Sequence, residues 1–142
     1  MSTENKAIVR RYFEEAWNQR KPALIDELVA VNAVHHDPAN PGLGPGPKGQ
    51  KELLAKYTSA FPDTRFTIDS VIAEGDMVAL RWSVRGTHQG ELEGIAATKR
   101  QVNLTGILMA QIANGKIAET WTNWDTLGML QQLGVVTRAR GA

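Results

Sequence analysis

The apolar positions of this 142-residue chain follow a helical period in its first third and an alternating period after it. In residues 8–17, large apolar side chains recur three and four positions apart, which predicts an amphipathic helix. Pro22 suits the first turn of a second helix. Residues 50–61 show helical spacing again, and Pro62 ends that segment. We therefore expect about three helices near the N-terminus.

The remaining chain alternates between apolar and polar residues, as strands do. Asn114-Gly115 is a strong hairpin signal, because both central residues of a type I′ turn need a positive φ. Helices followed by hairpin-linked strands predict an α+β fold, a single domain over residues 1–142 whose curved, mostly antiparallel sheet wraps around the helices. A sheet closed on one side by helices encloses an apolar interior suited to a small molecule. The predicted strands are residues 64–73, 77–85, 101–113 and 116–124.

The last strand, Lys116 to Trp124, leads to the best candidate for a reactive group. Unbroken alternation places Trp121, Asn123 and Asp125 on one face, so Asp125 is expected to project into the interior. An aspartate at this junction is also a preferred N-cap for the apolar turn that follows. The local sequence leaves both interpretations open.

Composition excludes several classes of function. The formal net charge is +1, from 16 basic and 15 acidic residues, so there is no electrostatic footprint of a nucleic-acid or membrane-surface protein. The chain has no cysteine, which rules out disulfides and thiolate chemistry. No apolar run approaches the roughly 20 residues that span a bilayer, and we expect a cytoplasmic protein. Residues 40–49, rich in Pro and Gly, are expected to form a surface loop or a pocket rim.

Three histidines are further candidates for the site. Neighbouring strand residues face opposite ways, so only one of His35 and His36 can line a pocket. His88 lies in a bend at residues 86–90. The spacing of these histidines and Asp37 matches no metal motif, so no metal site is expected.

Seven short motifs occur in an order typical of one family. In chain order they are Tyr12-Phe13-Glu14-Glu15-Ala16-Trp17-Asn18, Ala60-Phe61-Pro62-Asp63, Glu74-Gly75-Asp76, Gly86-Thr87-His88-Gln89-Gly90, Gly115-Lys116-Ile117-Ala118-Glu119-Thr120-Trp121, Trp124-Asp125-Thr126-Leu127-Gly128 and Gln132-Leu133-Gly134. Together they resemble the SnoaL-like polyketide cyclases of the NTF2-like superfamily. The resemblance covers nearly the whole chain.

This resemblance implies a cone-shaped α+β barrel that assembles as a homodimer or homotetramer. It implies an intramolecular aldol condensation that closes the last ring of an aromatic polyketide methyl ester, with neither metal nor other cofactor. Asp125 takes the place of the family's general acid/base. By spacing, Met109 and Gln111 take the places of the Gln and His beside it, and Trp121 is expected to stack on the flat substrate.

Two alternatives remain open at this stage. An epoxide-hydrolase-like enzyme would use Asp125 and Arg81, with a water held by an amide such as Gln111 or Asn123. A non-catalytic small-molecule-binding module would leave Asp125 as a helix cap. The side chains expected to contact the hydrophobic substrate are His36, Arg81, His88, Met109, Gln111, Trp121 and Asn123.

Overall fold

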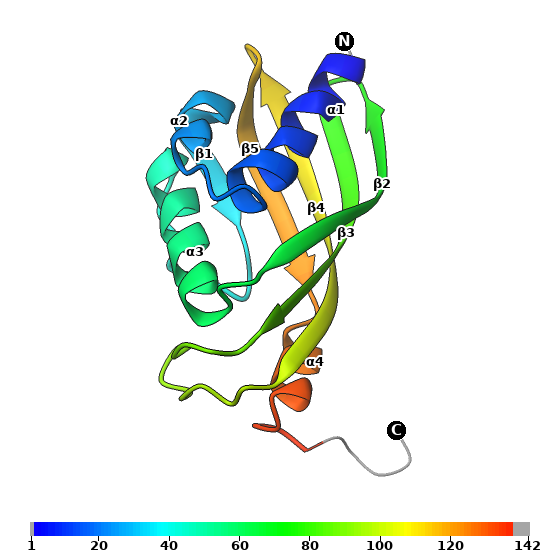
Figure 1. The fold of residues 1–142 in the computed structure, drawn as a ribbon. Coiled ribbons are helices and arrows are strands. Elements are labelled where there is room, and N and C mark those ends of the chain that lie inside the picture. The colour runs from blue at the N-terminus through cyan, green and yellow to red at the C-terminus, as the bar shows by residue number, and fades with distance from the viewer. Residues whose placement is uncertain (1, 138–142) are drawn as a thin grey trace.

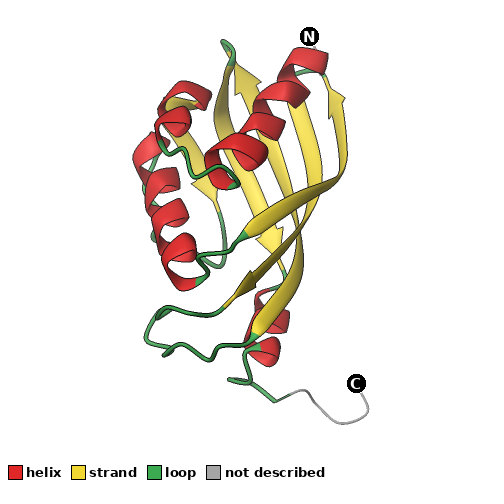
Figure 2. Cartoon of the chain, viewed as in Figure 1, coloured by secondary structure: helices red, strands yellow, loops and turns green. Residues whose placement is uncertain are grey.

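The computed structural model describes residues 2–137, and its N-terminal helices lie against one face of a curved sheet (Figure 1). Figure 2 shows the same view coloured by secondary structure. The helices are α1 (Ser2–Arg11), the π-helical η1 (Tyr12–Trp17), α2 (Ala23–Leu28), α3 (Gly46–Ala60) and α4 (Thr126–Gln132). The strands are β1 (Val29–His36), β2 (Arg65–Glu74), β3 (Met77–Thr87), β4 (Gln101–Ala113) and β5 (Lys116–Trp124).

The five strands form one sheet in the order β1-β5-β4-β3-β2. β1 pairs with β5 in parallel, and the other neighbours are antiparallel. The sheet curves around the helices without closing, which confirms the predicted α+β class. β1 is the strand that the sequence did not delimit. It begins at Val29, which pairs with Ile117.

Local sequence set most of the other boundaries. β4 and β5 coincide with the predicted strands, and Asn114 and Gly115 between them have φ angles of 52° and 74°, as the turn requires. α3 starts four residues before the predicted Gln50. Pro47 explains the difference, because a proline in the first helical turn forgoes only an N–H that would have no intrahelical partner.

The main core lies between the helices and the concave face of the sheet. It joins Val9 and Phe13 on the N-terminal helices to Leu80, Leu108 and Ile117 on three strands. A smaller apolar cluster packs α4 against the far end of β4. Within the described residues, no helix is both long enough and apolar enough to cross a membrane.

A bulge in β5 changes which side chains face this core. Ile112 pairs with Ile117, but its neighbour Gln111 pairs with Glu119, so Ala118 is an extra residue with no partner. One extra residue reverses the alternation of every side chain beyond it.

The reversal is visible in the burial of β5. Ile117 and Thr120 are both buried, although they are three positions apart. Beyond the bulge the even-numbered residues face the helices, and Trp121 and Asn123 face the outside of the sheet. The side-chain alternation expected from the sequence is therefore correct before Ala118 and inverted after it.

Candidate active site

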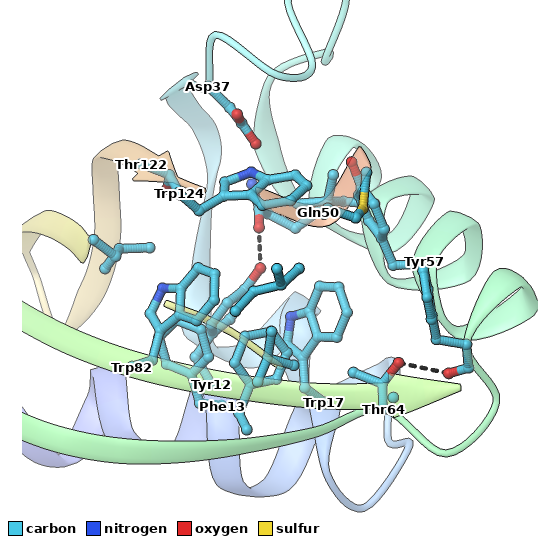
Figure 3. A pocket seen from close by; sticks show the side chains of 18 of the residues that line it. Tyr12, Phe13, Trp17, Asp37, Gln50, Tyr57, Thr64, Trp82, Thr122 and Trp124 are labelled. Atoms are coloured by element: carbon cyan, nitrogen blue, oxygen red, sulfur yellow. Dashed lines mark hydrogen bonds between the residues drawn. The ribbon is translucent and has the colours of Figure 1, made fainter. Parts of the chain in front are cut away.

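A largely apolar cavity opens between the helices and the concave face of the sheet (Figure 3). Its empty space, mouth included, is about 840 Å³. Side chains from η1, α3 and all five strands contribute to its wall. The apolar interior expected from the fold is thus present.

Aromatic side chains form one end of the cavity. Phe66 lies between Trp17 and Trp82, with ring centroids 5.1 Å from each. Phe13 packs 5.1 Å from Phe66 in a tilted arrangement. Such flat, rigid surfaces favour flat apolar ligands, because a stacked or edge-on ring loses little freedom on binding.

The Trp82 indole owes its position to a glycine on the neighbouring strand. Trp82 pairs with Gly106 of β4, and a Cβ atom at Gly106 would lie only 2.2 Å from the Trp82 ring. The missing side chain therefore lets the indole lie against β4.

Polar groups gather at the other side of the cavity, around Asp37. This residue directly follows β1 and is 8% exposed. In Figure 3 its carboxylate is directed toward Trp124 and Gln50, and the Tyr12 hydroxyl donates a hydrogen bond to Gln50. Tyr57 lines the cavity from α3. Among residues 2–137, Asp37 is the only carboxylate that lines the cavity.

Two local hydrogen bonds fix the Asp37 carboxylate. Its Oδ1 accepts from the Ala39 backbone N–H at 2.9 Å, and its Oδ2 accepts from Asn40 Nδ2 at 3.0 Å. A carboxylate has about four acceptor positions, so each oxygen retains a lone pair for a substrate proton.

Both tyrosines of the cavity are neutral at physiological pH. Burial raises the pKa of Tyr12 above its ordinary value, and the negative charge of Asp37 raises it further. Burial raises the pKa of Tyr57 to about 12; a hydrogen bond with Asn40 opposes that rise, and the charges of Glu93 and Asp37 add to it. The two phenols are therefore hydrogen-bond donors that feel the Asp37 charge.

His35 lines the cavity but has both ring nitrogens engaged. Nε2 lies 3.1 Å from the Gly46 carbonyl, which can only accept, so Nε2 carries the proton. Nδ1 then accepts from the Thr120 hydroxyl at 2.9 Å. Burial lowers the pKa of His35, which keeps the ring neutral. His35 is thus locked in one tautomer and joins β1, β5 and the start of α3.

Comparison with known proteins decides the family. The family model described as SnoaL-like polyketide cyclase matches residues 7–133. The chain belongs to the SnoaL-like polyketide cyclase family. The comparison with curated proteins found no match.

Solved structures agree with this assignment. IdmH from Streptomyces antibioticus, described as a candidate polyketide cyclase, is 32% identical, with a TM-score of 0.80 over 92% of this chain and 98% of its own. AclR from Streptomyces galilaeus, described as a candidate hydroxylase, is 28% identical, with a TM-score of 0.86. The match covers 99% of this chain and 87% of AclR. TsrD from Streptomyces laurentii is 26% identical, with a TM-score of 0.85. The match covers 94% of this chain and 97% of TsrD. These three proteins share the fold, but their descriptions do not name one common activity.

In this SnoaL-like protein, Asp125 lies outside the cavity wall and caps α4. The side chain is exposed, and its Oδ1 accepts a hydrogen bond from the Gly128 N–H at 2.8 Å. A Cβ at Gly128 would lie 2.0 Å from Asp125 Oδ2, so this glycine makes room for the carboxylate. The expectation that Asp125 faces the pocket is wrong, because the bulge at Ala118 turns that face outward, and the capping alternative describes its geometry.

The same reversal removes Trp121 and Asn123 from the expected pocket, and His36 of β1 pairs with Trp121 on the outer face. His36 stacks on Trp121 on the outer face of the sheet, with ring centroids 5.4 Å apart and planes inclined by 13°. His36 Nε2 also lies 2.7 Å from Glu119 Oε2. Asn123 is exposed. Of the two neighbouring histidines, His35 is therefore the one that faces the cavity.

Met109 and Gln111 on β4 also face outward. The even-numbered residues of that strand are buried, and Met109 is 42% exposed. Gln111 Nε2 donates to Asp76 Oδ2 at 2.9 Å. Spacing to Asp125 suggested these two positions, and the error in the Asp125 face carried over to them.

Arg81 and His88 are not in the cavity wall of the described chain either. Arg81 Nη1 donates to Asp69 Oδ2 at 3.2 Å on the outer face. His88 is fully buried, and its Nδ1 accepts from the Thr98 N–H at 3.1 Å. Its ring packs 5.3 Å from the Phe61 ring. Within the described residues no group of three or more His, Asp or Glu side chains could hold a metal ion.

Sequence reasoning missed Asp37 and Tyr57 as site residues. Asp37 was considered only as a member of a rejected metal set, and Tyr57 was not proposed for the site. The available signal was that Asp37 directly follows a short extended segment and precedes the Pro- and Gly-rich loop at residues 40–49. Recognising it required knowing that residues 29–36 form a strand that pairs with β5.

Proposed function

We propose that this protein closes a ring of an aromatic polyketide-type substrate by intramolecular aldol condensation, with Asp37 as the general acid/base. Family membership supports the cyclase class. The observation that carries the proposal is the position of Asp37, the one carboxylate lining the cavity within residues 2–137. The aromatic end, around Phe66, would hold the flat part of the substrate.

The proposed reaction moves one proton out and back. The Asp37 carboxylate removes a proton from the carbon between two carbonyl groups of the substrate, which leaves an enolate and a neutral carboxylic acid. The enolate carbon attacks a second carbonyl carbon of the same molecule, and a C–C bond forms as the C=O π bond becomes an alkoxide. The Asp37 acid returns its proton to that alkoxide, which regenerates the carboxylate.

The cavity supplies two further contributions to this step. The Tyr57 hydroxyl stays protonated at neutral pH and can donate to a substrate oxygen, whereas the Tyr12 hydroxyl already donates its proton to Gln50. The apolar walls restrict the substrate to folded conformers and exclude water, which strengthens the electrostatic interactions inside.

A matched pair of variants tests the proposal. Asp37→Asn keeps the shape of the side chain but removes the base, so kcat/KM should fall by about 10²–10⁴-fold. Asp125→Asn should keep both the fold and the activity, because Asn is as good an N-cap as Asp. The assay uses an anthraquinone methyl ester with a β-keto side chain, and chromatography separates the cyclised product, which has the same mass.

Stability must be measured alongside. In Asp37→Asn, the new amide NH₂ would face the Asn40 NH₂ that now bonds Oδ2, and the lost hydrogen bond costs about 1 kcal/mol. Scanning calorimetry separates this small loss from lost catalysis. Full activity of Asp37→Asn, or loss of activity in Asp125→Asn alone, would refute the assignment of the base.

A second candidate function is small-molecule binding without turnover. The capping role of Asp125 favours it, since the position that matches the family's general acid/base is occupied by a structural residue here. Quenching of tryptophan fluorescence by the same ester, with no cyclised product from the wild-type protein, would support this function over the cyclase.

We also propose that the protein forms a homodimer through the outer face of the sheet. One row of residues crosses all five strands there: Ile72, Ala79, Met109, Trp121 and His36. Ile72 is 68% exposed in the single chain. A continuous apolar row of this kind on a sheet marks a protein–protein contact.

A further inference from the structure

A chain of polar contacts connects the Asp37 carboxylate to a lysine at the protein surface. Asn40 Nδ2 donates to Asp37 Oδ2 at 3.0 Å, and Lys56 Nζ donates to Asn40 Oδ1 at 2.8 Å. Lys56 also forms an ion pair with Glu93, which belongs to the loop between β3 and β4. Asn40 is 9% exposed, so the middle of this chain is shielded from water.

The chemistry of the partners fixes the orientation of the Asn40 amide. An ionised carboxylate only accepts hydrogen bonds and an ammonium only donates them. The amide must therefore turn its NH₂ to Asp37 and its oxygen to Lys56. A flipped amide would place donor against donor and acceptor against acceptor. An amide can serve both partners at once, which an alanine or a second carboxylate cannot do.

We propose that Asn40 is a positioning residue for Asp37, and that it couples the carboxylate to the positive charge of Lys56. The proposal rests on the proposed function of Asp37. The turn after β1 already anchors Oδ1 through the Ala39 N–H. Asn40 fixes Oδ2, so the two contacts together hold the plane of the carboxylate and leave the remaining lone pairs directed away from the turn.

Lys56 is the cation that this chain of contacts brings to Asp37. His35 is neutral and both tyrosines are protonated. Charged side chains that the described residues place around Asn40 include Lys56, Glu93 and Glu52, and Arg85 lies in the cavity wall. Arg85 lines the cavity from β3, and Glu93 neutralises part of the Lys56 charge. The titratable groups that line the cavity with Asp37 are Tyr12 from η1, His35 from β1, Tyr57 from α3 and Arg85 from β3. Lys56 from α3 and Glu93 from the β3–β4 loop lie on the other side of Asn40.

Three variants test this role. Asn40→Ala removes the amide, and Lys56→Met removes the charge but keeps much of the side-chain length. Lys51→Met is the matched control, because Lys51 lies on the same helix and pairs with Asp26 on the surface. Should Asn40→Ala fail to fold, the substitution at Lys56 still tests the coupling.

Two readouts separate positioning from simple structural support. In Asn40→Ala, kcat/KM should fall by about 10-fold or more, as expected for a lost hydrogen bond to a charged group. The acid limb of its pH–rate profile should move to higher pH, because the anion loses its donor. An NMR titration of the Asp37 carboxyl carbon should give a higher midpoint in Asn40→Ala than in the wild type, and a smaller change in Lys56→Met, because only the first variant loses the donor itself. Lys51→Met should match the wild type.

The outcomes distinguish this inference from the proposed function. An unchanged Asp37 titration in both Asn40→Ala and Lys56→Met would overturn the coupling, even if Asp37→Asn proves inactive. If Asn40→Ala lowers kcat/KM but leaves the pH–rate profile unchanged, Asn40 only supports the structure and does not position the Asp37 carboxylate. A shifted titration together with an active Asp37→Asn variant would keep the coupling and overturn the catalytic role of Asp37.

Discussion

Gly106→Ala is the substitution whose consequence the structure determines most directly. The new Cβ would lie 2.2 Å from Cζ2 of Trp82 and 2.6 Å from both Cε2 and Cη2. Non-bonded carbons sit about 3.5–4.0 Å apart, so the indole must move by more than about 1 Å. It cannot move freely, because Phe66 packs 5.1 Å away on one side.

The expected cost follows from two opposing effects. Overpacking of a core costs about 1–3 kcal/mol, while replacing glycine by alanine stabilises by about 0.4–1 kcal/mol through the unfolded chain. We expect a net loss of about 1–2 kcal/mol, which is a fall in Tm of roughly 3–8 °C for a domain of this size. The displaced indole should also narrow the aromatic end of the cavity and weaken binding of a flat ligand.

Scanning calorimetry on a double-mutant cycle measures this effect. Trp82→Phe removes the three atoms that the new Cβ would meet, so Gly106→Ala should cost little or nothing in that background. Gly42→Ala is the control, because nothing lies within 4 Å of a Cβ there. The packing argument would be refuted if Gly106→Ala lowered the Tm equally in the wild type and in the Trp82→Phe variant. It would also be refuted if Gly106→Ala left the Tm of the wild type unchanged.

Three further predictions follow from the same geometry. Burial holds the pKa of His35 below its usual value. As the pH drops, the unfolded chain therefore gains a proton near pH 6.5 that the folded chain does not gain. The Tm should fall between pH 7 and pH 5, and it should fall less in His35→Gln. Asp125→Ala should cost about 0.5–2 kcal/mol in urea unfolding through loss of the α4 cap, with Asp125→Asn near wild type; equal losses in both would contradict the cap. Met109→Glu should make the proposed dimer monomeric in sedimentation velocity while circular dichroism shows that the fold is retained; an unchanged sedimentation coefficient would place the interface elsewhere.

The sequence determined the elements whose signals are local. The Asn114-Gly115 hairpin, the bounds of β4 and β5 and the helical N-terminus all follow from turn chemistry and periodicity over a few residues. The inward face of β3, with Leu80 and Trp82, also followed from alternation alone. The order of these elements was enough to indicate the family.

Tertiary structure alone decided the site. The extra residue at Ala118 has no signature in the sequence, because a bulge is defined by the partner strand: only the pairing with β4 shows that Ile117 and Thr120 share a face. This one unpaired residue inverted the faces of β5 beyond it, so Trp121, Asn123 and Asp125 do not face the expected pocket. Asp37 entered it because β1 pairs with a strand more than 80 positions away, a long-range contact that no local pattern encodes.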